Sequence, residues 1–123
     1  MLVEGFYTVA TTKQISENEI HVTVQLHEEH PIFEGHFPGN PVTPGVCMIQ
    51  IIKEIVQEYL NMKLFIKGIS NVKFTALINP NINAELLLEL SIVQIDGVVK
   101  VKNISKFVDG TIALKYNSTF IER

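Results

Sequence analysis

Hydrophobic and polar residues alternate along residues 18–27, and this pattern predicts a half-buried strand. Its apolar face consists of Ile20, Val22, Val24 and Leu26. Residues 2–12 predict a further strand, and residues 15–18 predict the turn between the two. The chain therefore begins with a pair of strands that have one face to bury.

A helical pattern replaces the alternation between Gly45 and Asn61. Polar residues recur there at steps of three and four, which places them on one stripe of the helix: Gln50, Lys53, Glu54, Gln57, Glu58 and Asn61. The earlier positions of this stripe hold Val46 and Cys47. We therefore expect the first helical turn to be buried on all sides.

Proline punctuates the connection between the second strand and the helix, residues 28–44. The prolines are Pro31, Pro38, Pro41 and Pro44. Because proline lacks an amide donor and fixes φ, this segment does not suit a regular strand. Thr43 is the expected N-cap of the helix, and Pro44 suits the first helical position.

Only strands are predicted after the helix, over residues 64–78, 82–92, about 98–108 and about 111–121. Strict alternation is seen at Ile82, Ala84, Leu86, Leu88, Leu90 and Ile92. In the last strand the residues that share the inner face are Ile112, Leu114, Tyr116 and Phe120. The phase slips at Val93 and Ile95, which predicts a bulge or burial on both faces. Asp96-Gly97 predicts a two-residue hairpin turn, and Asp109-Gly110 a further turn.

This order of elements predicts an α+β fold in which a long, curved antiparallel sheet wraps one central helix. The later strands are expected to form a meander. The predicted strands are long, on the order of 11–14 residues against a usual length of about 5–6. We expect residues 1–123 to form a single domain.

Composition narrows the class of protein. The 46% hydrophobic content is enough for a sizeable core in 123 residues, and the net charge of −3 argues against a nucleic-acid partner. The single cysteine, Cys47, excludes an internal disulfide. The first residues do not resemble a signal peptide, and no apolar run approaches the about 18 residues of a membrane span. We expect a soluble, cytoplasmic protein.

The strongest motif is residues 36–46, which read HFPGNPVTPGV. This segment closely resembles the active-site loop of the 3-hydroxyacyl-acyl carrier protein dehydratases, H-F-P-G-x-P-x-x-P-G-V. The match is complete, with five Pro or Gly positions and His36 at fixed spacing. The segment from Lys73-Phe74 to Asn79-Pro80-Asn81 is similar to a later family segment that usually reads Lys-Phe … Pro-Gly-Asp. The resemblance implies a hotdog fold, whose order of elements is the one predicted above.

The resemblance also implies a division of chemical roles. His36 would remove the proton next to the thioester carbonyl, and the backbone N–H at the helix start would polarise that carbonyl. The substrate-binding positions implied by the motif are Phe37, Pro38, Gly39, Gly45 and Val46. No cofactor or metal is implied.

The second catalytic position departs from the family. Relatives carry Glu or Asp fourteen positions after the histidine, on the helix of the partner subunit, to protonate the departing hydroxyl; here that position is Gln50. An amide has no proton to give at useful pH, and loss of general acid catalysis costs about 10²–10⁴-fold in rate. Glu54 lies one helical turn after Gln50, about 6 Å further along the helix axis.

Three functions remain open. The first is a dehydratase acting on (3R)-3-hydroxyacyl thioesters of acyl carrier protein. The second is a non-catalytic or weakly active acyl-thioester-binding subunit that pairs with an active homologue, with His36 from this chain and the carboxylate from the partner. The third is a hotdog thioesterase, for which Glu54 is the candidate carboxylate. The resemblance implies a homodimer or a higher oligomer of dimers, with a mixed dimer in the second case.

Other residues with possible chemistry have competing interpretations. Cys47 suits burial as a small apolar residue better than nucleophilic chemistry. His27-Glu28-Glu29-His30 lacks the spacing of a helical zinc pair, so a solvated edge is expected rather than a metal site. Phe33 and Phe37 would line an acyl channel or pack under the loop. An acidic carrier protein would need a basic patch, for which the candidates are Lys63, Lys67, Lys73, Lys100, Lys102 and Lys106.

Overall fold

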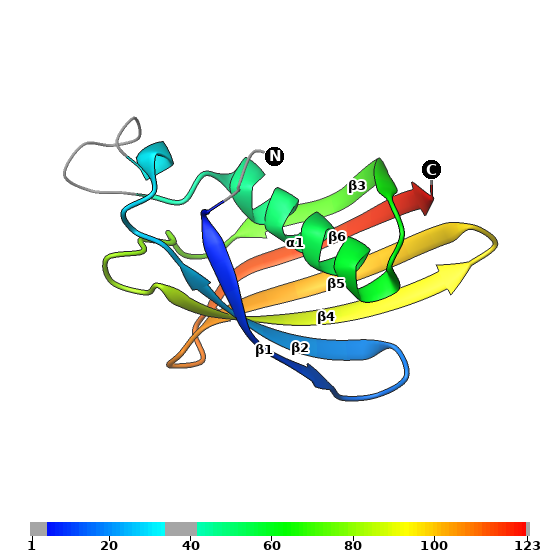
Figure 1. Ribbon diagram of the computed structural model, residues 1–123, viewed down its shortest axis with the longest axis horizontal. Coiled ribbons are helices and arrows are strands. Elements are labelled where there is room, and N and C mark those ends of the chain that lie inside the picture. The colour runs from blue at the N-terminus through cyan, green and yellow to red at the C-terminus, as the bar shows by residue number, and fades with distance from the viewer. Residues whose placement is uncertain (1–4, 34–41, 123) are drawn as a thin grey trace.

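The computed structural model describes residues 5–33 and 42–122, which form one antiparallel sheet and one long helix. The elements are β1 (Tyr7–Gln14), β2 (Glu19–Leu26), the 3₁₀ turn η1 (Pro31–Phe33), α1 (Gly45–Leu60), β3 (Leu64–Phe74), β4 (Glu85–Ile95), β5 (Val98–Phe107) and β6 (Ile112–Glu122). The strands are ordered β1-β2-β4-β5-β6-β3, and α1 crosses one face of the curved sheet (Figure 1). The predicted α+β class is confirmed.

The core lies between α1 and the facing side of the sheet. The helix contributes the buried residues Cys47, Met48, Ile51, Ile52, Ile55 and Val56. The central strands contribute alternate residues, among them Ile20, Val22, Val24, Leu26, Leu86, Leu88, Leu90 and Ile92. Each large aliphatic side chain buried in this way contributes about 1.5–3 kcal/mol. These are the residues that the alternating and helical patterns place on the apolar faces.

The start of α1 differs from expectation in two respects. Pro44, not Thr43, is the N-cap, with extended backbone angles of φ −61° and ψ 141°, and no side chain caps the helix. The Thr43 amide donates to Ile78 O at 2.8 Å, which holds Thr43 against the chain between β3 and β4 instead. Val46 is 60% exposed, so the first turn is not buried on all sides. Val46 lies four residues before Gln50, so the outward stripe simply begins earlier, with an apolar residue.

The sheet is not a simple meander of the last four strands. β4, β5 and β6 form a meander, but β3 pairs with β6 at the far edge (Figure 1). The strands contain 8–11 residues, fewer than predicted. Residues 75–84 leave the sheet to carry the chain from its edge to its interior, and Ile82 is 76% exposed as a result.

The hairpin between β4 and β5 confirms one prediction and corrects another. Asp96 and Gly97 both have positive φ, 51° and 77°, as a two-residue turn with the twist of the strands requires. The pairing of β4 with β5 runs without interruption to Ile95, so the predicted bulge is absent from it. Val93 and Ile95 lie beyond Ser91, where the pairing of β4 with β2 ends, and neither is buried.

β1 begins later than predicted, at Tyr7, and continues to Gln14. It pairs with β2, and the register shifts between Val9 and Thr11. The turn over residues 15–18 is confirmed, since the amides of Ile15 and Ser16 both donate to Glu19 O. Within the described residues, no helix has the length and apolarity needed to cross a membrane.

Candidate active site

Part of the predicted site falls outside the described residues. His36, Phe37, Pro38 and Gly39 lie between Phe33 and Val42, in the segment 34–41, so their roles stay predictions. The structure does place the rest of the predicted site on α1: Gly45 and Val46 at its first turn, and Gln50 one turn further. Phe33 is buried and stacks on Phe6, with ring centroids 5.1 Å apart. Phe33 therefore packs in the core.

The N-terminus of α1 lies close to β3. A Cβ atom built on Gly45 would stand 3.1 Å from Phe74 Cε2, closer than side chains normally pack, so glycine allows this approach. The exposed Val46 follows directly, and the Cys47 amide donates to Pro44 O at 3.0 Å. The helix thus starts next to an accessible surface, with the positive end of its dipole directed there. This geometry suits the polarisation of a carbonyl oxygen.

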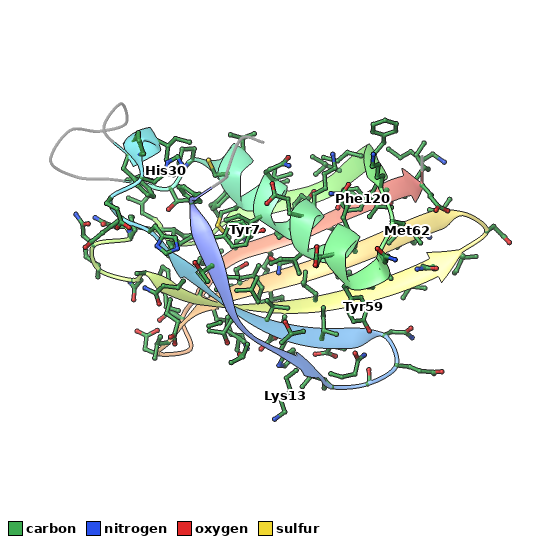
Figure 2. The ribbon with its side chains drawn as sticks, in the orientation of Figure 1. Tyr7, Lys13, His30, Tyr59, Met62 and Phe120 are labelled. Atoms are coloured by element: carbon green, nitrogen blue, oxygen red, sulfur yellow. The ribbon has the colours of Figure 1, made fainter. Side chains whose placement is uncertain are left out.

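Gln50 belongs to a hydrogen-bonded chain that joins α1 to β1. Gln50 Nε2 donates to Glu54 Oε2 at 3.1 Å, and the hydroxyl of Tyr7 donates to Glu54 Oε1 at 2.9 Å. Tyr7 projects from β1 toward the helix (Figure 2). Each of the two carboxylate oxygens therefore accepts a hydrogen bond from a different element. The helical stripe indicates the nearness of Gln50 and Glu54, but no pattern in the sequence points to Tyr7.

The surroundings of Tyr7 favour its protonated hydroxyl, which can donate a hydrogen bond. Burial, the hydrogen bond to Glu54 and the negative charges of Glu54 and Glu58 all raise the pKa of the Tyr7 hydroxyl well above its ordinary value. Burial likewise raises the pKa of the Cys47 thiol, so the helix N-terminus does not activate it. Cys47 is a buried core residue, as the sequence indicates.

A groove of about 970 Å³ runs between the polar stripe of α1 and the first two strands. Its lining consists of Tyr7, Val9, Val22, Glu54, Ile55, Gln57, Glu58, Asn61, Met62 and Lys63. Its carboxylates are those of Glu54 and Glu58. The Gln57 side chain is already engaged, because Gln57 Oε1 accepts from the Leu64 amide at 2.9 Å. The groove gives Glu54 contact with solvent.

The histidines next to η1 make local contacts. His27 hydrogen-bonds Thr8 and lies 3.6 Å from Glu29, and His30 Nδ1 accepts from the Ile32 amide at 3.1 Å. His30 also contacts Phe6 edge-on. No set of three metal-ligating side chains comes together in residues 5–33 and 42–122.

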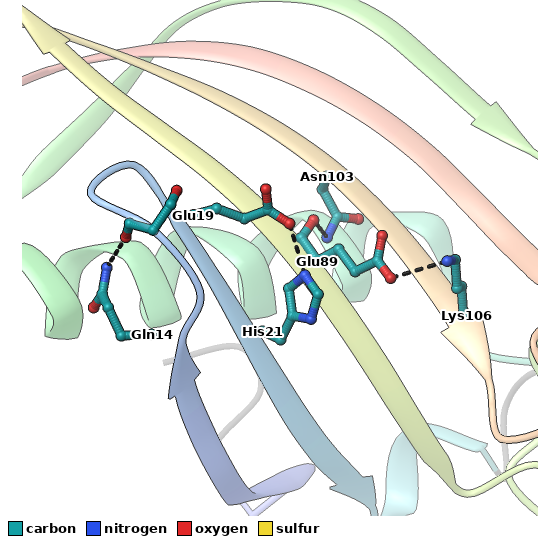
Figure 3. Close-up of polar contacts among 7 residues, drawn as sticks. Gln14, Glu19, His21, Glu89, Asn103 and Lys106 are labelled. Atoms are coloured by element: carbon teal, nitrogen blue, oxygen red, sulfur yellow. Dashed lines mark hydrogen bonds and ion pairs between the residues drawn. The ribbon is translucent and has the colours of Figure 1, made fainter.

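The predicted docking lysines are scattered. Lys106 pairs with Glu89 at 2.9 Å across β5 and β4 (Figure 3), and Lys63 lines the groove. The register pairs Lys100 with Val93 and Lys102 with Ser91, on the face of the sheet that points away from α1. Lys67 and Lys100 line one shallow hollow together with Asp96. Lys73 pairs in register with Lys115 and directly precedes Phe74, which packs against Gly45 at the helix N-terminus.

Comparison with known proteins agrees with the motif. A family model described as "ApeI dehydratase" matches residues 12–111. A 3-hydroxyacyl-[acyl-carrier-protein] dehydratase FabZ of Lactococcus lactis is 30% identical over 115 residues, covering 88% of this chain and 75% of that protein. One from Clostridium perfringens is 28% identical and covers 88% and 81%.

Solved structures share the fold. The dehydratase heterocomplex ApeI:P from Xenorhabdus doucetiae superposes with a TM-score of 0.75 at 22% identity, over 93% of this chain and 96% of that chain. A hypothetical thioesterase with coenzyme A from Streptococcus pneumoniae superposes with a TM-score of 0.67 at 12% identity, over 95% and 85%. The predicted hotdog fold is confirmed, and the chain belongs to the ApeI-like dehydratase family.

Proposed function

We propose that this protein removes water from (3R)-3-hydroxyacyl chains carried on acyl carrier protein and so forms trans-2-enoyl products. The observation that carries this proposal is the family match over residues 12–111 together with the complete loop motif from His36 to Val46. The substrate class follows from the relatives, which are 3-hydroxyacyl-[acyl-carrier-protein] dehydratases by name.

In the proposed reaction, His36 takes the proton from the carbon next to the thioester carbonyl. The backbone N–H groups at Gly45 and Val46 stabilise the negative charge that develops on the carbonyl oxygen. Phe37, Pro38 and Gly39 form the rest of the thioester site. Gln50 holds the departing hydroxyl by a hydrogen bond but supplies no proton.

The reverse reaction gives a direct test. Hydration of crotonyl or longer enoyl thioesters removes their ultraviolet absorbance, and we expect the purified protein to catalyse it. His36→Ala should lower kcat by about 10²-fold or more, because the general base is lost. Cys47→Ala is the control, since that buried thiol has no role in the proposed chemistry. Absence of hydration with every acyl carrier protein thioester tested contradicts a competent dehydratase.

A second function, a subunit that works with an active homologue, is favoured by one specific observation: Gln50 stands where the acid is expected. A solved neighbour is also a dehydratase heterocomplex by name. In this arrangement the partner contributes the carboxylate. This function is supported if the wild-type protein shows no turnover and the variant Gln50→Glu does. It is contradicted if a pull-down against cellular hotdog proteins recovers only the homodimer. Likeness to thioesterases at 12% identity does not favour the third function.

The edge strand β3 supports pairing with a second copy of the chain. β3 ends the sheet, so one side of its backbone has no neighbouring strand among the described residues. Ten of its eleven residues are exposed, and the large apolar ones are Phe65, Ile66, Ile69, Val72 and Phe74. Strand-to-strand pairing along β3 covers both the edge and this apolar surface. A homodimer, or a mixed dimer with a homologue, would form in the same way.

A further inference from the structure

The carboxyl group of Glu54 reaches the position at which the site lacks an acid. Glu54 Oε2 is 3.1 Å from the amide nitrogen of Gln50, the residue that replaces the family's Glu or Asp. We propose that Glu54 supplies the proton that leaves with the substrate hydroxyl, with Gln50 holding that hydroxyl next to it. This inference rests on the proposed dehydratase function and names the proton donor within it.

Helix geometry explains how Glu54 covers the distance. Its Cα lies about 6 Å further along the axis than that of Gln50. Side chains of a helix lean toward its N-terminus, however, so the side chain of residue i+4 lies over the preceding turn. The hydrogen bond between Gln50 and Glu54 shows that this lean brings the two groups into contact. A hydroxyl bound to the Gln50 amide therefore lies within reach of Glu54.

Tyr7 selects the oxygen that carries the proton. The Tyr7 hydroxyl donates to Oε1 at 2.9 Å and remains protonated, because burial and the nearby carboxylates oppose its ionisation. Oε2 accepts from Gln50 Nε2 in the structure, so it is the oxygen that can carry a proton once the Gln50 amide turns from Glu54 to the substrate hydroxyl. Tyr7 is a positioning residue in this arrangement.

The groove allows Glu54 to be reprotonated. Glu54 is half-buried and lines the groove of about 970 Å³ together with polar groups of α1. Water in the groove reaches the carboxylate after each turnover. Glu58, one turn further on α1, lines the same groove but is exposed and lies further from Gln50.

The step balances in protons and electrons. The Cα–H bond breaks, its proton passes to the imidazole of His36, and its electron pair forms the new carbon–carbon double bond. The C–O bond breaks with its electron pair on oxygen, which takes the proton from Glu54 Oε2 and leaves as water. The imidazolium then returns one proton to the Glu54 carboxylate through water, which restores both groups.

Glu54→Gln, with Glu58→Gln as its matched control, separates loss of the proton donor from loss of a nearby carboxyl group. Each variant replaces one carboxyl group on the same helical stripe by an amide. We expect Glu54→Gln to lower kcat by about 10²–10⁴-fold with KM little changed, because an acid is lost rather than a binding group. Glu58→Gln should retain wild-type kcat. Wild-type kcat in Glu54→Gln overturns the inference, as does an equal loss in the two variants.

Exchanging the two side chains provides a rescue. In the double variant Gln50→Glu/Glu54→Gln the carboxyl and the amide trade places, and their mutual hydrogen bond is kept. We expect this variant to recover most of the activity that Glu54→Gln alone loses. Failure of the exchange to raise kcat above that of Glu54→Gln overturns the inference, provided that both variants melt at the wild-type temperature.

Failure of this inference is distinguishable from failure of the proposed function. If the wild type is inactive and Gln50→Glu gains hydration, then the proposed chemistry survives and Glu54 is not the donor, since it was present throughout. If neither protein hydrates an enoyl thioester, then the proposed function itself fails.

Discussion

Two tyrosines of the fold have opposite surroundings. Tyr116, on the inner face of β6, is fully buried, and its hydroxyl makes no hydrogen bond of good geometry within the described residues, although the Ser118 side chain lies near it. Tyr7 is half-buried and its hydroxyl donates to Glu54. An unpartnered buried hydroxyl costs about 1–3 kcal/mol, whereas a formed hydrogen bond contributes about 1 kcal/mol.

The same substitution should therefore have opposite effects at the two positions. We expect Tyr116→Phe to raise the free energy of unfolding by up to about 1 kcal/mol, and Tyr7→Phe to lower it by about 1 kcal/mol. Urea denaturation followed by circular dichroism measures both. A clear loss of stability in Tyr116→Phe would show that its hydroxyl is satisfied in solution.

At the residue scale, the sequence predicts contacts within an element better than contacts between elements. Gln50 and Glu54 lie on one stripe because helical periodicity puts them there, and their hydrogen bond follows from that spacing. Tyr7 joins them from 47 residues away, and only the packing of β1 against α1 makes that contact. At Thr43 a tertiary contact overrides a local preference. Local preference predicts that Thr43 caps the helix, but its amide hydrogen-bonds Ile78 O and Pro44 is the N-cap instead.

At the scale of elements, the β4–β5 hairpin depends on the backbone of its turn. Gly97 has φ +77°, a conformation that costs an L-residue with a side chain about 1 kcal/mol or more, whereas glycine adopts it freely. We expect Gly97→Ala to lower the free energy of unfolding by about 1–2 kcal/mol. Val108→Ala is the control, since Val108 is 74% exposed and lies outside β3. Equal stability of the two variants in urea would contradict this account.

The apolar edge of β3 predicts a change in oligomeric state. Ile69 is 45% exposed on the face of β3 that adjoins the core, in register with Ser118 of β6. Ile69→Lys places a charge in the proposed contact between copies, so sedimentation should show a shift from dimer to monomer. Val108→Lys, at a position 74% exposed between β5 and β6, should leave the dimer intact. A monomeric wild type, or dissociation by both substitutions alike, would remove the case for β3 as the interface.

Element types are readable from this sequence because burial is one-sided in most of them. β2 and β4 alternate cleanly since one face of each packs under α1, and the helical stripe is clear for the same reason. β3 is a strand as predicted, but it ends at Phe74 rather than at residue 78, and Leu64 is its one buried residue. The position of β3 beside β6 also has no local signal, since strand order is fixed by which edges pair in three dimensions.

At the scale of the whole molecule, the proposed chemistry distributes its groups between subunits. The resemblance to the dehydratases implies that the histidine of one chain works with the helix of its partner, and the proposed donor Glu54 lies on that helix. Each dimer would then contain two sites, and each site would take one group from each chain. Variants that damage different groups should complement one another when their subunits mix.

We therefore expect activity to return when His36→Ala and Glu54→Gln chains are co-expressed. If the two chains assort at random, about half of the dimers are mixed. Each mixed dimer has one site with both defects and one site with neither. We therefore expect about a quarter of wild-type activity. Two tags on the chains, with sequential affinity purification, isolate the mixed dimer, whose activity should approach about half of the wild-type value. The control is a pair of chains that both carry Glu54→Gln, in which every site is defective. If the mixed dimer is no more active than this control, the prediction is wrong. In that case both groups of each site come from the same chain, because every site in the mixed dimer then carries one of the two defects.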